Sequence, residues 1–455
     1  MTDLVVYPVE KPLQGGVPVP TDKSIGHRAL LFSALANGTS RIQKFAGGGD
    51  NISTANALRA MGVQIDESEP KPDAPGGREL TVRGVGIFGL IKPEGPLDCG
   101  NSGTTMRLFC GLLAAQEFPT LLIGDASLSG RPMMRIIKPL SLRGAKISGS
   151  AHPKKANEVT APLAIEGLPE DAYLTELEYE SEVSSAQVKS AILLSGLYAH
   201  GVTYFREPTV SRDHTERMMQ ALGVPLKTMG PLVQLDPSGW RGVIDPLDIE
   251  VPGDLSAAAF LITAAQIVAG SNVSMRGVGV NPTRTGILEI VRDMGGSIAM
   301  DKQTERSGEP VADIHARGSS LHSARIGGEL VARAIDEIPI VCALAARAIG
   351  TTEISGAAEL RVKETDRIAA MASVLRAFGV ECEEHPEGMS IVGTQEKLRA
   401  AEVESRGDHR IAMTSAILAL VADGPSKIKD VDCIATSFPR FVGTLRALGA
   451  RLEVS

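Results

Sequence analysis

One pattern recurs six times along this chain: an apolar residue, two variable residues, a second apolar residue and then a glycine. Apolar residues three positions apart share one face of a helix, and a glycine directly after them is the usual left-handed end of that helix. The six glycines are 82, 79, 72, 84 and 70 residues apart. They are Gly62, Gly144, Gly223, Gly295, Gly379 and Gly449. Only the second copy departs from the pattern, because Arg143 takes its second apolar position.

A short apolar stretch, typical of a strand, follows most of these glycines, as at residues 63–65 and 450–454. The pattern predicts six copies of one α/β unit of roughly 70–80 residues, longer than a typical solenoid repeat. Three copies in each half indicate two lobes. We assign residues 21–250 to a first lobe and residues 1–20 with 251–455 to a second, and we expect an exposed turn at residues 67–78.

Composition narrows the class of protein. The hydrophobic content of 43% is enough for a large core, and the formal net charge of −8 argues against nucleic acid as a partner. The N-terminus lacks the basic and then apolar pattern of a signal peptide, and no apolar run reaches the ~18 residues of a membrane span. We therefore expect a cytoplasmic protein with reduced, mostly buried thiols. The cysteines are Cys99, Cys110, Cys342, Cys382 and Cys433, with no Cys-x-x-Cys pair.

Basic and small hydroxyl residues stand where several helices are expected to begin. Asp22 or Ser24 can cap a helix that carries Lys23, Ser24 and Arg28 in its first turns. A helix N-terminus with Lys and Arg is an anion site, although a capped and solvated helix start is the plain alternative. Two further segments have the same features: residues 101–107, where Asn101 or Ser102 is the cap and Gly103 and Thr104 follow, and residues 184–190 with their three serines.

The second half of the chain repeats this arrangement with acids added. Residues 361–367 are expected to open the helix that ends at Gly379, with Lys363 and Arg367 on one face and Glu364 near two cations. Asp336 and Glu337 start another helix, and residues 408–413 a third. A Gly/Ser loop at residues 124–132 includes Arg131. A charged, solvated helix face is again the alternative.

Taken together, these starts predict a binding site. If the units pack in parallel within each lobe, their basic N-termini point one way, and two facing lobes would enclose an electropositive cleft for small polyanions. The sequence has no Walker A loop, no Gly-x-Gly-x-x-Gly turn opening a βα unit and no Gly-x-Ser-x-Gly elbow. The spacing of His and Cys suggests no metal site.

The chain resembles the 5-enolpyruvylshikimate-3-phosphate (EPSP) synthase family across essentially its full length. The resemblance is carried jointly by residues 22–28 (DKSIGHR), 100–104 (GNSGT), 361–367 (RVKETDR) and 408–413 (DHRIAM). It implies an α/β fold of two lobes, each of three βαβαββ units (an inverted α/β barrel), with a cleft between them. The implied reaction transfers the enolpyruvyl group of phosphoenolpyruvate to the 5-hydroxyl of shikimate 3-phosphate and releases phosphate. It belongs to the shikimate pathway of aromatic amino acid biosynthesis, needs no cofactor or metal, and is the target of glyphosate.

The same resemblance implies the roles of individual residues. Catalysis would use Asp336 as the base, Glu364 as the acid that protonates C3, and Lys23 and Lys363 to stabilise charge and pass protons. Lobe closure would exclude water. Shikimate 3-phosphate would be held by Ser24, Arg28, Ser185, Ala186, Gln187 and Arg212, with the Ser185 hydroxyl on its phosphate. Phosphoenolpyruvate would be held by Lys23, Asn101, Gly103, Thr104, Arg131, Arg367, His409 and Arg410, near Asp336 and Lys363.

Some positions depart from the best-known members of the family. Ala186 stands where they have a second serine, and Thr436 where they have a phosphate-binding lysine. With Arg212, these residues resemble a divergent group of the family that includes glyphosate-tolerant enzymes. Two alternatives remain open: UDP-N-acetylglucosamine enolpyruvyl transferase, which uses a Cys in the loop where residues 125–130 have none, and a non-enzymatic anion-binding repeat protein. We expect a monomer.

Overall fold

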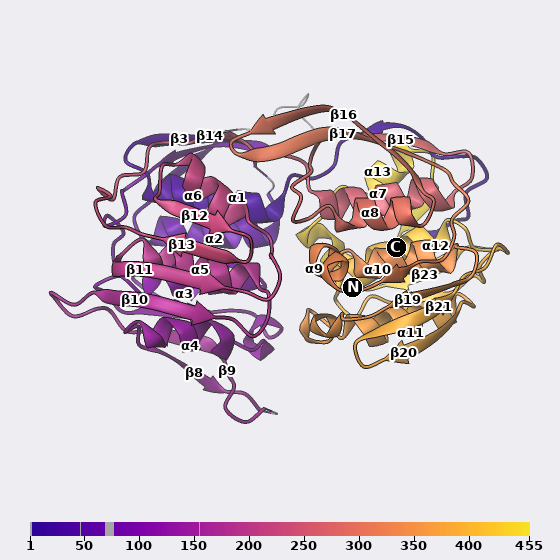
Figure 1. Cartoon of the computed structure of the whole chain (residues 1–455). Helices are drawn as coiled ribbons and strands as arrows, with labels where there is room; N and C mark the ends of the chain where they lie inside the picture. The colour runs from indigo at the N-terminus through magenta and orange to yellow at the C-terminus, as the bar shows by residue number, and fades with distance from the viewer. Residues whose placement is uncertain (1, 46, 69–76, 154) are drawn as a thin grey trace. The chain divides into compact units, whose positions relative to one another are not determined.

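The computed structural model describes residues 2–45, 47–68, 77–153 and 155–455. The chain forms two compact units (Figure 1). The N-terminal unit consists of Thr21–Val251 and the short segment Arg306–Glu309. The C-terminal unit consists of Met1–Pro20, Pro252–Glu305 and Pro310–Ser455. The turn expected at residues 67–78 lies largely outside the described residues; strand β4 ends at Glu67 and strand β5 begins at Arg78.

The described strands form six sheets of four strands each, three in each unit. Every sheet contains one parallel pair of strands followed by antiparallel pairing, with one strand of the parallel pair at an edge. In four sheets a helical segment separates the parallel strands in sequence, whereas β14 with β3 and β2 with β15 come from distant parts of the chain. The sheet with strand order β10-β11-β13-β12 is an example, since β10 and β11 pair in parallel and β13 is antiparallel to both of its neighbours. The expected βαβαββ repeat, three copies to a unit, is confirmed.

In the N-terminal unit, the first repeat takes its first strand from the end of the unit, because β14 pairs in parallel with β3. The first repeat contains α1 (Lys23–Leu35), β3 (Thr39–Phe45), α2 (Gly49–Ala60), β4 (Gln64–Glu67), β5 (Arg78–Arg83) and β14 (Asp248–Glu250). The second contains β6 (Leu97–Asp98), α3 (Gly103–Leu113), β7 (Thr120–Ile123), η1 (Leu128–Gly130), α4 (Met134–Leu142), β8 (Ile147–Ala151) and β9 (Val159–Ile165). The third contains β10 (Leu174–Glu180), α5 (Ala186–Gly196), β11 (Ala199–Arg206), α6 (His214–Ala221), β12 (Leu226–Met229) and β13 (Leu232–Leu235).

In the C-terminal unit, two strands come from the start of the chain: β2 pairs in parallel with β15, and β1 pairs with β23 and β24. The first repeat contains β2 (Gln14–Val17), α7 (Leu255–Ile267), β15 (Asn272–Gly279), α8 (Gly286–Asp293), β16 (Ser297–Arg306) and β17 (Glu309–Arg317). The second contains β18 (Arg325–Ile326), α9 (Glu329–Ala334), α10 (Ile338–Ala346), β19 (Thr351–Ile354), η2 (Ala358–Val362), α11 (Arg367–Ala377), β20 (Glu381–His385) and β21 (Gly388–Val392). The third contains β22 (Glu402–Glu404), α12 (His409–Ala419), β23 (Ser426–Lys429), η3 (Asp432–Thr436), α13 (Phe441–Ala447), β24 (Leu452–Val454) and β1 (Leu4–Val6).

The six glycines that defined the repeat end six helices, as predicted. Each has a positive φ, between 72° and 103°, and follows the last helical residue by two positions. Glycine suits this left-handed conformation because a Cβ would clash with the backbone. An edge strand of each sheet begins two or three residues later. The local stop pattern therefore sets the boundary between the helix and the following strand in all six repeats.

Arg143, the exception in the repeat, is fully buried behind α4. Its guanidinium donates to the hydroxyls of Ser195 and Thr203, both at 2.7 Å, and to the carbonyls of Thr175 and Ile192. Burial lowers the pKa of Arg143 to about 10. A polar side chain is tolerated at this apolar position because uncharged oxygens satisfy its donors.

Each unit has its own hydrophobic core around helices that are buried on nearly every side. In the N-terminal unit these are α1, α3 and α5, and in the C-terminal unit α7, α10 and α12. A Cβ on Gly111 of α3 would lie 2.1 Å from the carbonyl oxygen of Ala191, so only glycine permits α3 to pack so closely on α5. The starts of these central helices hold the candidate site residues.

No helix in the described part of the chain has both the length and the apolar character needed to cross a membrane. All five cysteines are free. Cys99, Cys110 and Cys342 are buried, whereas Cys382 and Cys433 are partly accessible. The expectation of unpaired, mostly buried thiols is confirmed.

Candidate active site

Helix α1 begins where the basic segment was expected to form a helix start. Asp22 is the cap, because its side chain accepts a hydrogen bond from the Ile25 amide at 2.9 Å. Lys23 is the first helical residue, and its ammonium lies 2.8 Å from the Asp50 carboxylate of α2. The cationic side chain at this helix start is therefore paired with an acid that the sequence did not single out.

Arg28 lies one turn further along α1 and is buried. Its guanidinium donates to the hydroxyls of Thr215 at 2.6 Å and Ser190 at 2.7 Å, and to the carbonyl of Ser24 at 3.0 Å. Burial lowers the pKa of Arg28 to about 10, and the nearby charge of Arg212, in the loop before α6, acts in the same direction. Arg28 therefore contacts the backbone of Ser24, and Arg212 lies near enough for its charge to act on Arg28.

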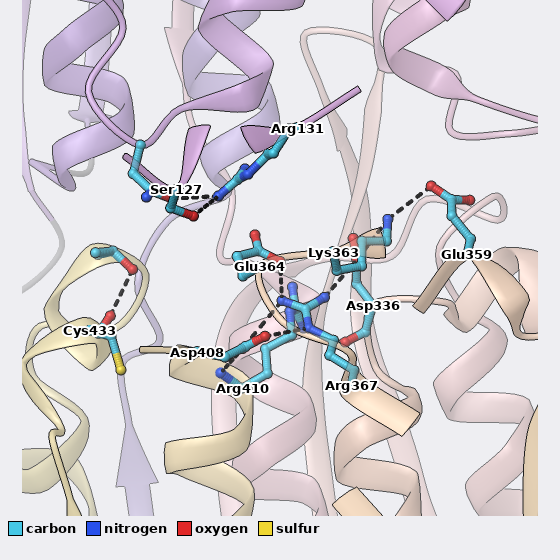
Figure 2. A network of polar contacts seen from close by, with 12 residues as sticks. Ser127, Arg131, Asp336, Glu359, Lys363, Glu364, Arg367, Asp408, Arg410 and Cys433 are labelled. Atoms are coloured by element: carbon cyan, nitrogen blue, oxygen red, sulfur yellow. Dashed lines mark hydrogen bonds and ion pairs between the residues drawn. The ribbon is translucent and has the colours of Figure 1, made fainter. Parts of the chain in front are cut away.

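Asn101 and Arg131 meet at the start of α3. Arg131 donates to the Asn101 side-chain oxygen at 2.7 Å and lies 3.4 Å from the Ser127 hydroxyl (Figure 2). The Asn101 amide donates to Asp125 at 2.6 Å. Ser102, and not Asn101, caps α3 by accepting from the Thr105 amide at 3.1 Å. Asn101 is therefore available to orient Arg131.

Thr104 and Gln187 connect the starts of α3 and α5. The Gln187 amide donates to the Thr104 hydroxyl at 3.0 Å, and its oxygen accepts from Arg107 at 2.6 Å. Ser185 caps α5 in an extended conformation, and Ala186 is the first helical residue. Backbone amides at the start of a helix, together with a serine hydroxyl, suit an oxyanion.

In the C-terminal unit, Asp336 lies between two cations at the start of α10. Its carboxylate is 3.6 Å from the Lys363 ammonium and 3.6 Å from the Arg367 guanidinium (Figure 2). Lys363 also pairs with Glu359 at 3.1 Å. The predicted base and one of the predicted proton-passing lysines are therefore neighbours.

Arg367 is the centre of this network and is only 2% exposed. It donates to Glu364 at 2.6 Å and to Asp408 at 2.8 Å (Figure 2). Burial opposes its charge, but the carboxylates of Glu364 and Asp408 raise the pKa of Arg367 above its usual value. The guanidinium remains charged in the folded protein and can attract an anion.

Arg410 and His409 begin α12. Asp408 caps this helix by accepting from the Arg410 amide at 2.9 Å. The Arg410 guanidinium donates to the carbonyl of Asp336 at 2.7 Å, which joins α12 to the start of α10. His409, the first residue of α12, is buried. All the predicted site residues of the C-terminal unit therefore lie near the starts of α10, α11 and α12.

One prediction about local structure is wrong. Lys363 and Arg367 were expected to lie on one face of a single helix, but α11 begins only at Arg367, with Asp366 as its cap. Lys363 ends the short 3-10 helix η2 in an extended conformation. Both side chains nevertheless reach Asp336, because the extended link turns Lys363 back toward α10.

Thr436, which stands where the best-known family members have a lysine, takes part in a local hydrogen bond. Its hydroxyl donates to the carbonyl of Cys433 at 2.7 Å at the end of η3. A hydroxyl used in this way closes a local turn. The unusual residue therefore has a structural explanation that needs no ligand.

The sequence alone gave no role to several residues that lie beside the site. Asp50, Arg107, Ser190 and Thr215 orient predicted residues in the N-terminal unit, and Asp408 holds Arg367 in the other. Arg107 follows Gly103 by four residues, so helical spacing would have found it. Asp50 and Thr215 come from parts of the chain that carried no local signal, whereas Ser190 and Asp408 lie within the segments 184–190 and 408–413 that the sequence had singled out. Among the described residues, no three His, Cys, Asp or Glu side chains are arranged to hold a metal ion.

Comparison with known proteins gives consistent results. The family model described as EPSP synthase (3-phosphoshikimate 1-carboxyvinyltransferase) matches residues 8–445. A 3-phosphoshikimate 1-carboxyvinyltransferase of Geobacter sp. (strain M21) is 50% identical over 98% of this chain and 99% of its own. The enzyme of the same name from Geobacter sulfurreducens is 49% identical over 99% of this chain and 100% of its own.

Solved structures agree with the sequence matches. EPSP synthase from Acinetobacter baumannii superimposes with a TM-score of 0.87 at 42% identity, covering 100% of both chains. The enolpyruvyl transferase NikO from Streptomyces tendae gives a TM-score of 0.76 at 16% identity, covering 100% of this chain and 99% of NikO. At that identity the NikO match supports the fold alone.

Proposed function

This chain belongs to the EPSP synthase family, and from that premise we propose how its residues divide the work of the reaction. The enzyme transfers the enolpyruvyl group of phosphoenolpyruvate to shikimate 3-phosphate and releases phosphate, a step of the shikimate pathway of aromatic amino acid biosynthesis. The sugar-nucleotide alternative is set aside, because the family model and relatives near 50% identity are EPSP synthases. Relatives that catalyse a reaction also leave no support for a non-enzymatic anion-binding protein.

Shikimate 3-phosphate, we propose, is held by the N-terminal unit. Ser185 with the first amides of α5 takes the phosphate, while Arg28 and Arg212 supply positive charge. Arg28 suits this role because its hydrogen bonds go to uncharged oxygens, while nearby carboxylates, among them Glu216, keep its guanidinium charged. Ser24, Ala186 and Gln187 line the same site.

Phosphoenolpyruvate carries a carboxylate and a phosphate, and we assign it to arginines and lysines of both units. Arg367, His409 and Arg410 act from the C-terminal unit, and Lys23, Asn101, Gly103, Thr104 and Arg131 from the N-terminal unit. The charge of Arg367 is secured by its carboxylate neighbours. A guanidinium can bind a carboxylate or a phosphate through two parallel hydrogen bonds.

In the chemical steps, Asp336 removes the proton of the 5-hydroxyl of shikimate 3-phosphate. The oxygen of that hydroxyl bonds to C2 of phosphoenolpyruvate. Glu364 delivers a proton to C3, which converts the double bond to a methyl group and develops positive charge at C2. Loss of a C3 proton and cleavage of the C2–O bond to phosphate then restore the enol ether. Lys23 and Lys363 stabilise the phosphate that departs and carry protons.

The observation that carries this assignment is the cluster around Arg367, where a candidate base and a candidate acid share one buried cation. The test is phosphate release from purified protein supplied with both substrates, with either substrate omitted as the control. Replacing shikimate 3-phosphate by UDP-N-acetylglucosamine checks the related reaction. Release only with shikimate 3-phosphate and phosphoenolpyruvate together is expected, and no release with both would reject the proposal.

We also propose that the enzyme works as a cytoplasmic monomer. The absence of any disulfide among its five cysteines fits a reducing compartment. Each unit has its own hydrophobic core, so that folding of neither requires a second copy of the chain. Sedimentation equilibrium across a range of protein concentrations tests the monomer.

A further inference from the structure

Glu337 follows the proposed base Asp336 directly, but the two side chains have different surroundings. The Asp336 carboxylate contacts Lys363 and Arg367 and is 17% exposed. The Glu337 side chain is only 2% exposed and lies against the start of another helix, α7. A buried carboxylate is unfavourable unless nearby positive charge and hydrogen bonds compensate it. The proposed chemistry gives Glu337 no role, so its retention needs a different explanation.

The compensation comes from Ser256 and Arg284. The Ser256 hydroxyl, at the start of α7, donates a short hydrogen bond to the Glu337 carboxylate. Arg284 in turn donates to the Ser256 hydroxyl at 2.6 Å and to Asp254, the cap of α7, at 3.1 Å. The serine hydroxyl therefore accepts from a cation and donates to an anion, which fixes the orientation of both.

Arg410 stands on the other side of Glu337. The nearest nitrogen of its guanidinium is 4.0 Å from the Glu337 carboxylate, and the Arg284 guanidinium is at the same distance. That Arg410 nitrogen also donates to the carbonyl of Asp336 at 2.7 Å. Glu337 thus lies between two arginines, and one of them is the arginine assigned to phosphoenolpyruvate.

We propose that Glu337 is a positioning residue for this reaction: its buried carboxylate, held by Ser256 and Arg284, keeps Arg410 in place for phosphoenolpyruvate. The inference rests on the proposed function, because it takes Arg410 as a substrate-binding residue. The same contact joins the starts of α7, α10 and α12, so the Asp336 backbone is fixed together with Arg410. Without the negative charge, Arg284 and Arg410 would lie on either side of an uncharged side chain, and the hydrogen bond to the Asp336 carbonyl would remain to hold Arg410.

The test is Glu337→Gln, which keeps the size of the side chain and an oxygen for the Ser256 hydroxyl but removes the charge. Steady-state phosphate release is measured with each substrate varied while the other is saturating. We expect KM for phosphoenolpyruvate to rise about tenfold and KM for shikimate 3-phosphate to stay within twofold, since no shikimate-binding residue contacts this group in the proposed assignment. A general loss of structure would instead change both values or the yield of folded protein.

The matched control is Glu289→Gln. Glu289 pairs with Arg333 at 2.5 Å on α8 and α9 of the same unit, is 40% exposed and belongs to no proposed site. Both KM values of this variant should equal those of the wild type. If Glu337→Gln does not fold, Ser256→Ala provides the second test, because it removes the hydroxyl between Arg284 and Glu337; a rise in KM for phosphoenolpyruvate alone of about threefold is expected.

The possible outcomes distinguish failure of the proposed function from failure of the role proposed for Glu337. A wild-type protein that releases no phosphate rejects the proposed function and the inference with it. An active wild type, with folded Glu337→Gln or Ser256→Ala variants whose KM for phosphoenolpyruvate is unchanged, overturns the inference alone. Equal rises in both KM values would also overturn it, because Glu337 would then be a general structural residue.

Discussion

Arg28 and Arg367 are both buried arginines at helix starts, but their surroundings differ. Arg28, in the N-terminal unit, donates to two hydroxyls and a carbonyl. Arg367, in the C-terminal unit, donates to the carboxylates of Glu364 and Asp408. Burial therefore lowers the pKa of Arg28 to about 10, whereas the carboxylates raise that of Arg367.

The difference matches the work assigned to each unit. The hydrogen bonds of Arg28 go to uncharged oxygens, while the carboxylates of Glu216, Asp22 and Glu309 favour its charge from nearby. This arrangement suits a site that only holds shikimate 3-phosphate. Carboxylate partners neutralise part of the charge of Arg367, but they place acids and a base beside it, which suits proton transfer. Burying an ion pair gives little net stability by itself, so the acids around Arg367 are better explained by chemistry than by folding.

The largest effect should come from the acids. Glu364→Gln keeps the hydrogen bond to Arg367 at the same length but cannot deliver a proton. We expect kcat to fall at least 100-fold while the KM values stay within about threefold, because general acid catalysis contributes about 10²–10⁴ to a rate. A phosphate-release assay at saturating concentrations of both substrates measures kcat.

Glu359→Gln is the matched control for that variant. Glu359 lies in the same segment and pairs with Lys363 at 3.1 Å, but it is not an assigned acid. Its kcat should remain within a few-fold of the wild type. If Glu364→Gln keeps more than a tenth of the wild-type kcat, another residue protonates C3.

The uncharged support of Arg28 is tested by Thr215→Val, which removes the hydroxyl at 2.6 Å without changing the shape of the side chain. Loss of a buried hydrogen bond to a charged group costs about 2 kcal/mol. We expect KM for shikimate 3-phosphate to rise about 30-fold and KM for phosphoenolpyruvate to change little. Thr120→Val is the control, since the buried Thr120 hydroxyl has no hydrogen-bond partner in the described structure. If KM for shikimate 3-phosphate changes equally in Thr215→Val and Thr120→Val, then Thr215 contributes to folding only.

His27, the neighbour of Arg28, provides a pH test of how strongly this region is shielded from solvent. Burial, acting with the charges of Lys23 and Arg28, outweighs the carboxylates of Asp50 and Asp22 nearby. The His27 ring contacts the Thr54 hydroxyl at 2.7 Å, and burial lowers its pKa to about 3 from 6.5. Between these values the unfolded chain binds a proton that the folded chain does not, so the free energy of unfolding falls as pH decreases from 6.5 toward 3. The loss at pH 5 is about 2 kcal/mol.

His27→Asn should remove this contribution. Urea denaturation at pH 7 and pH 5 should show a smaller loss of unfolding free energy for the variant than for the wild type. His200→Asn is the control, because His200 is exposed and stacks on Tyr173. If the wild type and His27→Asn lose the same free energy of unfolding between pH 7 and pH 5, then His27 becomes protonated in the folded protein. Its ring would then be less buried than the structure indicates.

The sequence was sufficient for features that depend on neighbouring residues. The six helix ends and the count of six α/β units follow from local stop patterns, whereas the βαβαββ order came from the family resemblance. Residue type narrowed the cap of α1 to Asp22 or Ser24, and the structure shows Asp22. The helical register of Lys363 and Arg367 was wrong because Asp366, itself a good cap, starts the helix three residues later than Lys363. The cap preference of Asp would have corrected it.

Contacts between segments far apart in the sequence could not be predicted from local patterns. Thr215 reaches Arg28 across 187 residues, and Glu337 contacts Ser256 across 81. Neither residue type is unusual at its position, so nothing in the sequence separates them from ordinary helix starts. Arg143 is the reverse case: it stood out, but its acceptors are carbonyls and hydroxyls whose positions only the folded chain defines.

Among these variants the smallest effect, a change of about tenfold in inhibition by glyphosate, is expected for Gly103→Ala. Gly103 lies beside two arginines of the N-terminal unit that donate to side-chain amide oxygens. A Cβ there would lie 2.9 Å from a terminal nitrogen of Arg107 and 3.2 Å from one of Arg131. Cations held by uncharged oxygens can shift, so Gly103→Ala should fold and keep KM for phosphoenolpyruvate within threefold. We expect glyphosate to compete with phosphoenolpyruvate and to use the space at Gly103. Its inhibition constant should therefore rise about tenfold in this variant, which means weaker inhibition. Gly130→Ala, with no atom within 4 Å of its Cβ, is the control, and an unchanged constant in Gly103→Ala would place glyphosate elsewhere.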